Sequence, residues 1–98
     1  MHTYQKYWKL TESHWTSAGH SCFGSESCDY NRVYSSKKRA IEAMKRKLRD
    51  WLEWEDDKKR VACMVLLETD EHVTAMSYDA RLDSWRAIDI ILEPTTIG

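Results

Sequence analysis

The most constraining feature of this sequence is the stretch of residues 35–60, because its apolar residues follow the period of an α-helix. They recur at the i, i+3, i+4 and i+7 spacing that places one apolar stripe against a core. The residues of the stripe are Ile41, Met44, Leu48, Trp51 and Leu52. Ser35 or Ser36 can cap the start, since a serine hydroxyl accepts hydrogen bonds from the free N–H groups of a first turn. We therefore predict one long amphipathic helix over residues 35–60.

The first half of this helix is basic, with seven cations against the single carboxylate Glu42 between residues 37 and 49. These cations oppose the helix dipole, whose positive end lies at the N-terminus, and this indicates a role in binding. The cations that share one flank of the stripe, and that we predict to face a partner, are Lys38, Arg39, Lys45, Arg46 and Arg49. The alternative is an ordinary solvated face held by i,i+4 pairs such as Glu42 with Arg46.

The segments on either side of the helix have the character of strands. Residues 4–10 are rich in aromatic side chains and alternate between two faces, and residues 61–67 form an apolar run typical of a central strand. Residues 72–78 and 84–93 follow after short polar connections, so an antiparallel meander is the simplest topology. The sequence predicts a single α+β domain over residues 1–98: a small, mostly antiparallel sheet of four to five strands, in the order β-(β)-α-β-β-β, with the helix on one face.

Two parts of the chain show no such pattern. Residues 11–31 are polar and small and keep no period, so we predict a long loop there, followed by a short strand over residues 30–34. Pro94 cannot donate to a sheet ladder, so we expect it to end the last strand and to leave residues 94–98 as a frayed tail.

The predicted loop holds four potential metal ligands within fifteen residues, namely His14, His20, Cys22 and Cys28. Imidazole and thiolate suit tetrahedral zinc, but the spacing lacks the tight Cys-x2-Cys pair of most structural zinc sites. We therefore predict no metal site and no cofactor, and keep a zinc-stabilised loop module as an alternative.

Cysteine use and hydropathy bear on the compartment. Three cysteines cannot all pair within one chain, and Cys63 lies in an apolar run where a reduced thiol packs like a small hydrophobic side chain. The sequence shows neither the apolar core of a secretory signal nor a run long enough to span a bilayer. We expect a cytoplasmic protein without a membrane partner.

Tryptophan is abundant, with five residues in 98. Trp8, Trp51 and Trp85 fall where large rings pack into a core, whereas Trp15 lies in the polar segment and Trp54 lies off the apolar stripe. Tryptophan is enriched among the residues that dominate binding energy at interfaces. We predict that Trp15 and Trp54 contact a partner, with folding back over the core as the alternative.

Charge is separated along the chain. Residues 1–34 are neutral overall, residues 35–60 carry ten cations and six carboxylates, and residues 61–98 carry two cations and seven carboxylates. The net charge of −1 disfavours a dedicated duplex-DNA binder, which is usually strongly basic. No nucleophile with an adjacent base, Gly-rich phosphate loop or metalloprotease motif is present, so we predict that the protein is not an enzyme.

These observations together favour a small binding protein. We predict that it inhibits or modulates a nucleic-acid-processing complex by stoichiometric protein–protein contact, as accessory proteins encoded by phages and mobile elements do. One alternative is a direct nucleic-acid-binding module that uses the basic flank and stacks bases on Trp15 or Trp54. Homo-oligomers are also compatible with the sequence, since a small sheet has edges that another copy can extend.

Overall fold

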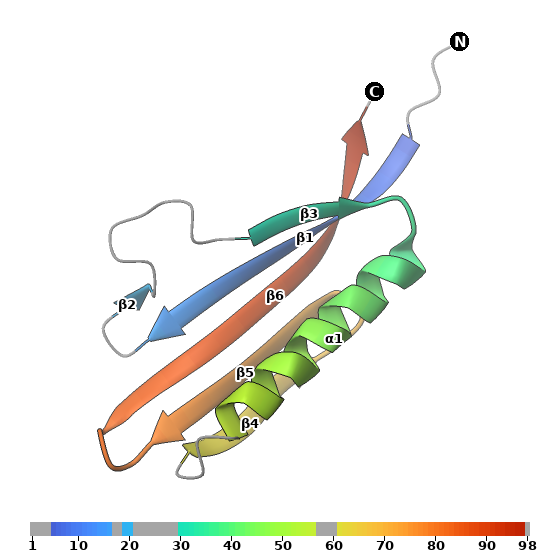
Figure 1. Cartoon of the computed structure of the whole chain (residues 1–98). Coiled ribbons are helices and arrows are strands. Elements are labelled where there is room, and N and C mark those ends of the chain that lie inside the picture. The colour runs from blue at the N-terminus through green and yellow to red at the C-terminus, as the bar shows by residue number, and fades with distance from the viewer. Residues whose placement is uncertain (1–4, 17–18, 21–29, 57–60, 98) are drawn as a thin grey trace.

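The structure, a computed structural model, describes residues 5–16, 19–20, 30–56 and 61–97 (Figure 1). The elements in chain order are β1 (Gln5–Thr16), β2 (Gly19–His20), β3 (Tyr30–Tyr34), α1 (Lys37–Asp56), β4 (Val61–Glu68), β5 (His72–Asp79) and β6 (Ser84–Ile97). The predicted α+β fold is confirmed: one helix lies on one face of an antiparallel sheet.

The strand order of the sheet is β2-β1-β6-β5-β4, with β3 paired to β1 along the same edge as β2. β1 pairs with β6 along its whole length, from Gln5 opposite Ile97 to Thr16 opposite Arg86. The last three strands, β4, β5 and β6, form the predicted antiparallel meander. The first and last strands of the chain therefore lie side by side inside the sheet, and α1 connects one outer edge of the sheet to the other.

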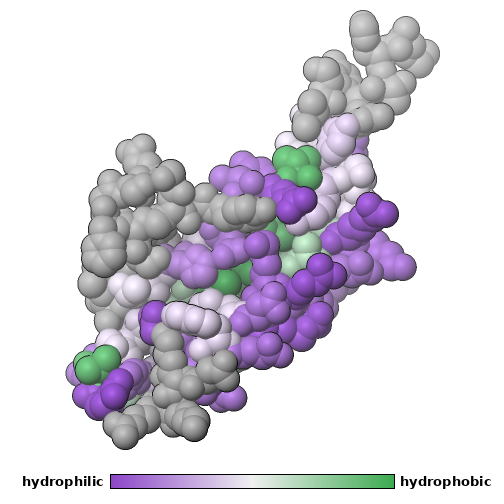
Figure 2. Space-filling model, in the orientation of Figure 1, coloured by the Kyte–Doolittle hydropathy of each residue, from purple (hydrophilic) through white to green (hydrophobic). Residues whose placement is uncertain are grey.

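The helix begins where the sequence allows a cap. The Arg39 N–H donates to the Ser36 hydroxyl at 3.4 Å, and the Ala40 N–H donates to the Ser36 carbonyl at 3.0 Å. The apolar stripe faces the sheet as predicted, and the core consists of Leu10, Ala40, Met44, Leu48, Trp51, Val73, Ala75, Ile88, Ile90 and Leu92. The outer side of α1 is hydrophilic (Figure 2). Within the described ranges no helix has the length and apolar character needed to cross a membrane.

The prediction of a loop over residues 11–31 is wrong for Thr11 to Thr16, which continue β1, and for Gly19 and His20, which form β2. The strand is hard to see in the sequence because its helix-facing positions after Leu10 are polar. Glu12 and His14 point to the helix side, where they bond to each other, so the usual alternation of polar and apolar residues is lost. Residues 17–18 and 21–29 lie outside the described part of the chain.

The prediction of a frayed tail from Pro94 is also wrong, because β6 continues to Ile97 opposite β1. The Leu92 N–H donates to the Glu71 carbonyl, on the side of β6 that faces β5. Because backbone groups alternate along a strand, the Pro94 nitrogen points to the same side, beyond His72, the first residue of β5, where the pairing with β6 stops. The missing donor therefore interrupts no ladder bond with β1.

The apolar run at residues 61–67 is an edge strand and not the predicted central one. β4 pairs with β5 on one side and is the last strand of the sheet. From Met64 to Leu67 its side chains are 40% to 62% exposed. The core of one chain therefore does not account for the apolar character of β4.

Ion pairs join the helix to the sheet. Lys37 pairs with Glu71 at 3.5 Å and Lys45 with Asp70 at 3.3 Å. Both acidic residues lie in the turn between β4 and β5, which Thr69 closes by accepting hydrogen bonds from the N–H groups of Glu71 and His72. The basic face of α1 is therefore partly neutralised by the acidic half of the chain.

Candidate binding groove

A cavity of about 510 Å³ lies beside the C-terminal end of α1, between the helix, the end of β1 and the start of β6. Three tryptophans line it, together with a histidine, an ion pair and two small residues. The lining residues are His14, Trp15, Thr16, Trp51, Trp54, Glu55, Arg86 and Ala87. We call this site the aromatic cavity. It brings the two predicted partner-binding tryptophans, Trp15 and Trp54, into one site, with exposed fractions of 42% and 55%.

Arg86 contacts two of the residues that line the aromatic cavity, Glu55 and Trp54. It lies in β6, and its Nε is 3.4 Å from Oε1 of Glu55 in the last turn of α1. Its guanidinium also lies over the Trp54 ring, at 5.1 Å from the ring centre. A cation over an indole face is attracted by the ring quadrupole, so Arg86 ties both the buried carboxylate and the exposed ring to the sheet.

Glu55 is fully buried although it is ionisable. Burial raises the pKa of its carboxyl above the ordinary value, because removing the charged form from water costs free energy. The charge of Arg86 and a hydrogen bond with Ser77 act in the opposite direction. These two partners therefore offset part of the effect of burial on the pKa of Glu55.

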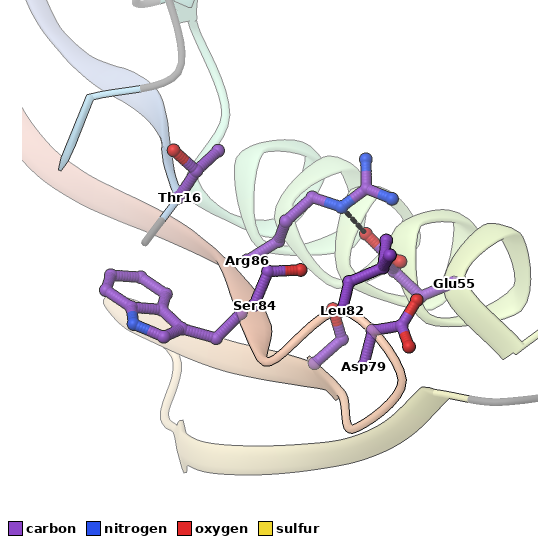
Figure 3. Close-up of a pocket in the computed structure, with 8 residues that line it drawn as sticks. Thr16, Glu55, Asp79, Leu82, Ser84 and Arg86 are labelled. Carbon is purple, nitrogen blue, oxygen red and sulfur yellow. Dashed lines mark ion pairs between the residues drawn. The ribbon is translucent and has the colours of Figure 1, made fainter. Parts of the chain in front are cut away.

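A second depression, of about 300 Å³, adjoins the aromatic cavity and shares Thr16, Glu55 and Arg86 with it. Figure 3 shows Arg86 reaching toward Glu55, with Leu82 and Asp79 at the β5–β6 turn. Asp83 in this turn has a left-handed backbone (φ 48°) and accepts a hydrogen bond from the Tyr78 hydroxyl. Aspartate tolerates this conformation better than most residues, so the turn can close tightly beside the site.

On the β1 side, a histidine and a carboxylate form a polar cluster. His14 Nε2 donates to Glu12 Oε2 at 2.5 Å, and Lys47 Nζ lies 3.1 Å from Glu12 Oε1. The hydrogen bond from His14, together with Lys47, lowers the pKa of Glu12 in spite of its burial. Glu12 and His14 also line a depression of about 290 Å³ together with Trp51 and Trp54. This depression extends the aromatic cavity along the helix.

A basic groove of about 320 Å³ lies further toward the start of α1, between the helix and β3. It is lined by three arginines, one carboxylate, a tyrosine and an alanine: Arg32, Arg39, Arg46, Glu42, Tyr34 and Ala43. Arg32 lies over the Tyr34 ring at 5.4 Å. Planar guanidinium groups bind carboxylates and phosphates in two-point contacts, so this groove has the chemistry of an anion site.

The residues of the predicted basic flank do not all lie at one site in the structure. Arg39 and Arg46 line the basic groove, while Lys45 points to Asp70 on the other side of the helix. Lys38 and Arg49 are exposed and line neither the basic groove nor the aromatic cavity. The predicted contact residues therefore form two sites along the helix and not one continuous face.

Two of the four candidate metal ligands, His14 and His20, lie in the described strands β1 and β2. His14 bonds to Glu12, and His20 lies opposite Trp15 in the sheet pairing. Cys22 and Cys28 lie outside the described residues. Among the residues that are described, no group of three or more His, Cys, Asp or Glu side chains could hold a metal ion.

Glu55 and Arg86 are the site residues that sequence reasoning missed, and each carried a signal. Glu55 lies seven residues after Leu48, on the apolar stripe of the helix, and Arg86 lies two residues before Ile88, on the apolar face of its strand. A charge at a core position is usually paired. One carboxylate and one cation, each on a buried face, were therefore candidates for an ion pair.

Comparison with protein-family models, with curated proteins and with solved structures gave no match for this chain.

Proposed function

We propose that this protein is a non-catalytic binding protein that acts by stoichiometric contact with another protein, and that the aromatic cavity is its anchor site. The observation that carries the proposal is Trp54, which is 55% exposed beside a cavity of about 510 Å³ and is held by Arg86. Tryptophan and arginine are the residues most enriched in binding hot spots, which form where a large side chain fills a pocket at the partner surface.

The geometry favours a protein partner over a nucleic acid at this cavity. Its lining contains a buried carboxylate, Glu55, paired to the one cation, Arg86, so no excess positive charge is directed into it. Nucleic-acid sites instead align several cations with the phosphate backbone. The charge separation of the chain supports the further proposal that the partner belongs to a nucleic-acid-processing complex, since such proteins carry basic surfaces that an acidic segment complements.

The test is an affinity pull-down from cell lysate, with and without nuclease, using the wild type, Trp54→Ala and Tyr78→Ala. Tyr78 is a matched control, because it is an exposed aromatic residue that does not line the aromatic cavity. We expect a protein partner that survives nuclease, persists with Tyr78→Ala and is reduced roughly 30-fold with Trp54→Ala, as for a hot-spot residue. Equal recovery with both variants would show that the cavity is not the binding site.

The basic groove supports a second candidate function, direct binding of single-stranded nucleic acid. Arg32, Arg39 and Arg46 converge on one groove, and an aromatic ring, Tyr34, lies in it. Cations that follow the backbone together with rings that stack on bases are the usual elements of such sites.

This second candidate is tested with a fluorescently labelled single-stranded oligonucleotide titrated at several salt concentrations. Direct phosphate contacts predict a log–log slope of about −0.7 for each contact. Reversing Arg39 and Arg46 to glutamate should abolish binding, whereas reversing Lys38 and Arg49 makes the same change in net charge outside the groove and should weaken it less. If both double variants bind equally well, the groove is not the site.

A further inference from the structure

Arg86 shows, within this chain, how the aromatic cavity holds a guanidinium group. Its guanidinium lies over the Trp54 ring, at 5.1 Å from the ring centre. Its Nε is at the same time 3.4 Å from Oε1 of Glu55 (Figure 3). A guanidinium is planar, so it can stack on an indole face and pair with a carboxylate together. The cavity therefore already combines the two contacts that suit an arginine side chain.

A second carboxylate adjoins the same ring. Asp50 lies four residues before Trp54 in α1, so the two side chains are neighbours on the helix surface. Both line the depression of about 290 Å³ beside the aromatic cavity, and Trp51 and Trp54 line the cavity as well as the depression. Asp50 is exposed and has no ion-pair partner among the described residues. Arg46, one turn earlier, lines the basic groove instead. Asp50 is therefore available to a cation that a partner brings to Trp54.

The charges around the cavity favour a cation as the occupant. Counted with a neutral His14, the cavity and the depression are lined by three carboxylates and two cations: Glu12, Asp50, Glu55, Lys47 and Arg86. Lys47 lies 3.1 Å from Glu12, and Arg86 pairs with Glu55, so the negative charge of Asp50 is left over. An acidic side chain would be repelled here, and an apolar one would take water from Asp50 without replacing it.

We propose that the partner protein contacts the aromatic cavity through an arginine, whose guanidinium stacks on Trp54 and pairs with Asp50 while its aliphatic stem lies in the cavity. The inference rests on the function proposed for this cavity and adds the chemical class of the group that the cavity takes. Glu55 neutralises Arg86, so the incoming cation meets no excess positive charge. Lysine carries the same charge but lacks the plane that stacks and the fork that binds a carboxylate at two points.

The first test measures the preference of the cavity with small probes in place of the partner. N-acetyl-arginine amide presents the guanidinium without terminal charges, and N-acetyl-citrulline amide has nearly the same shape without the charge. Each is titrated into isotope-labelled protein while NMR follows the tryptophan indole N–H signals. We expect the arginine probe to shift the Trp54 signal in a saturable and salt-sensitive manner, and the citrulline probe to leave it in place. Trp8 is the internal control, because it lines neither the cavity nor the depression.

A pair of matched variants tests the role of the carboxylate. Asp50→Asn should raise the dissociation constant of the arginine probe roughly fivefold, because it replaces a charged acceptor at a site partly screened by water. Glu53→Gln makes the same change in net charge on an exposed residue of the same helix that lines neither the cavity nor the depression. It should leave the dissociation constant nearly unchanged.

Three results of the titration would overturn the proposal: no saturable shift of the Trp54 signal, equal weakening by Asp50→Asn and Glu53→Gln, or binding of the citrulline probe, or of N-acetyl-lysine or N-acetyl-leucine amide, as strong as that of the arginine probe. The last result would assign the cavity to an uncharged, a lysine or an apolar side chain.

The same variants in the pull-down separate this inference from the function on which it rests. We expect Asp50→Asn to reduce recovery of the protein partner and Glu53→Gln to preserve it. Loss of the partner with Trp54→Ala but not with Asp50→Asn would overturn the arginine inference and leave the cavity as the binding site. A probe that binds through Trp54 and Asp50, beside a partner that Trp54→Ala still recovers in full, would instead place the failure in the proposed function.

Discussion

Replacing Arg86 by methionine should destabilise the protein, because the change leaves a buried carboxylate without its cation. Glu55 is fully buried, and Arg86 Nε is 3.4 Å from it. Removing one partner of a buried ion pair typically costs about 3 to 5 kcal/mol. The Arg86 side chain is 45% exposed, so water screens part of the attraction. We therefore expect a loss of about 2 kcal/mol in the free energy of unfolding at neutral pH, or about 8 to 16 °C in Tm.

The loss should depend on pH with a sign opposite to that of most carboxylates. Burial raises the pKa of Glu55 in the folded state above its ordinary value of 4.5. A group with a raised folded pKa contributes stability that is fully present below the unfolded pKa and is lost as pH rises through the folded pKa. Arg86→Met removes a cation that lowers this pKa. The free energy of unfolding of the variant should therefore approach that of the wild type as the pH falls toward 4.5, and the difference between the two should grow as the pH rises.

The assay is urea unfolding followed by tryptophan fluorescence over this pH range, for Arg86→Met, Glu55→Gln and the double variant. With a neutral glutamine at position 55, Arg86→Met should cost only the contact with Trp54, about 0.5 to 1 kcal/mol. The difference between the cost of Arg86→Met with Glu55 and its cost with Gln at position 55 is the coupling energy of the ion pair. A cost of Arg86→Met that is the same with Glu55 and with Gln at that position, or that does not change with pH, would refute the reasoning.

Two further predictions concern the core and the second carboxylate. Leu48→Ala should lower the free energy of unfolding by about 2 to 4 kcal/mol, because Leu48 is 1% exposed and the change leaves a cavity between α1 and the sheet. A loss below about 1 kcal/mol in the same urea assay would mean that the cavity collapses or that the helix face is misplaced. Glu12 has a pKa below its ordinary value of 4.5, so it contributes stability above pH 4.5 that is lost as the pH falls through the folded pKa. Glu12→Gln should therefore cost about 1 to 2 kcal/mol at neutral pH and flatten the acid limb of the stability curve, and an unchanged acid limb would contradict this assignment.

The helix and the meander could be predicted from the sequence because their apolar residues keep a clear period. Ile88 and Ile90 lie on either side of the polar residue Asp89, and Met44 and Leu48 lie one helical turn apart. The second half of β1 could not be predicted, because Glu12 and His14 put polar groups on the face where a strand normally places apolar ones. A local pattern shows which side chains are polar. It does not show that Glu12 pairs with both His14 and Lys47 next to the core.

The candidate site was predictable only in part, for a related reason. Trp54 lies off the apolar stripe of the helix, and this offset indicated an exposed ring. Its place beside Trp15 depends on the pairing of β1 with β6, which is a contact between distant parts of the chain. The position of β4 depends in the same way on which strand neighbours which, and an apolar run of seven residues reads alike at the centre and at the edge of a sheet.

The pairing of β1 with β6 also has a consequence for how the chain folds during synthesis. β6 lies between β1 and β5, yet it is synthesised after all the other described elements. Until residues 84–97 emerge, β1 lacks the partner that matches its whole length, and the β4–β5 hairpin lacks the strand that covers its inner side. Contacts between residues so far apart in sequence form slowly, because a long loop must close before they stabilise anything. We therefore expect this chain to complete its sheet only after residues 84–97 have emerged, with its most apolar strand exposed to chaperones in the interval.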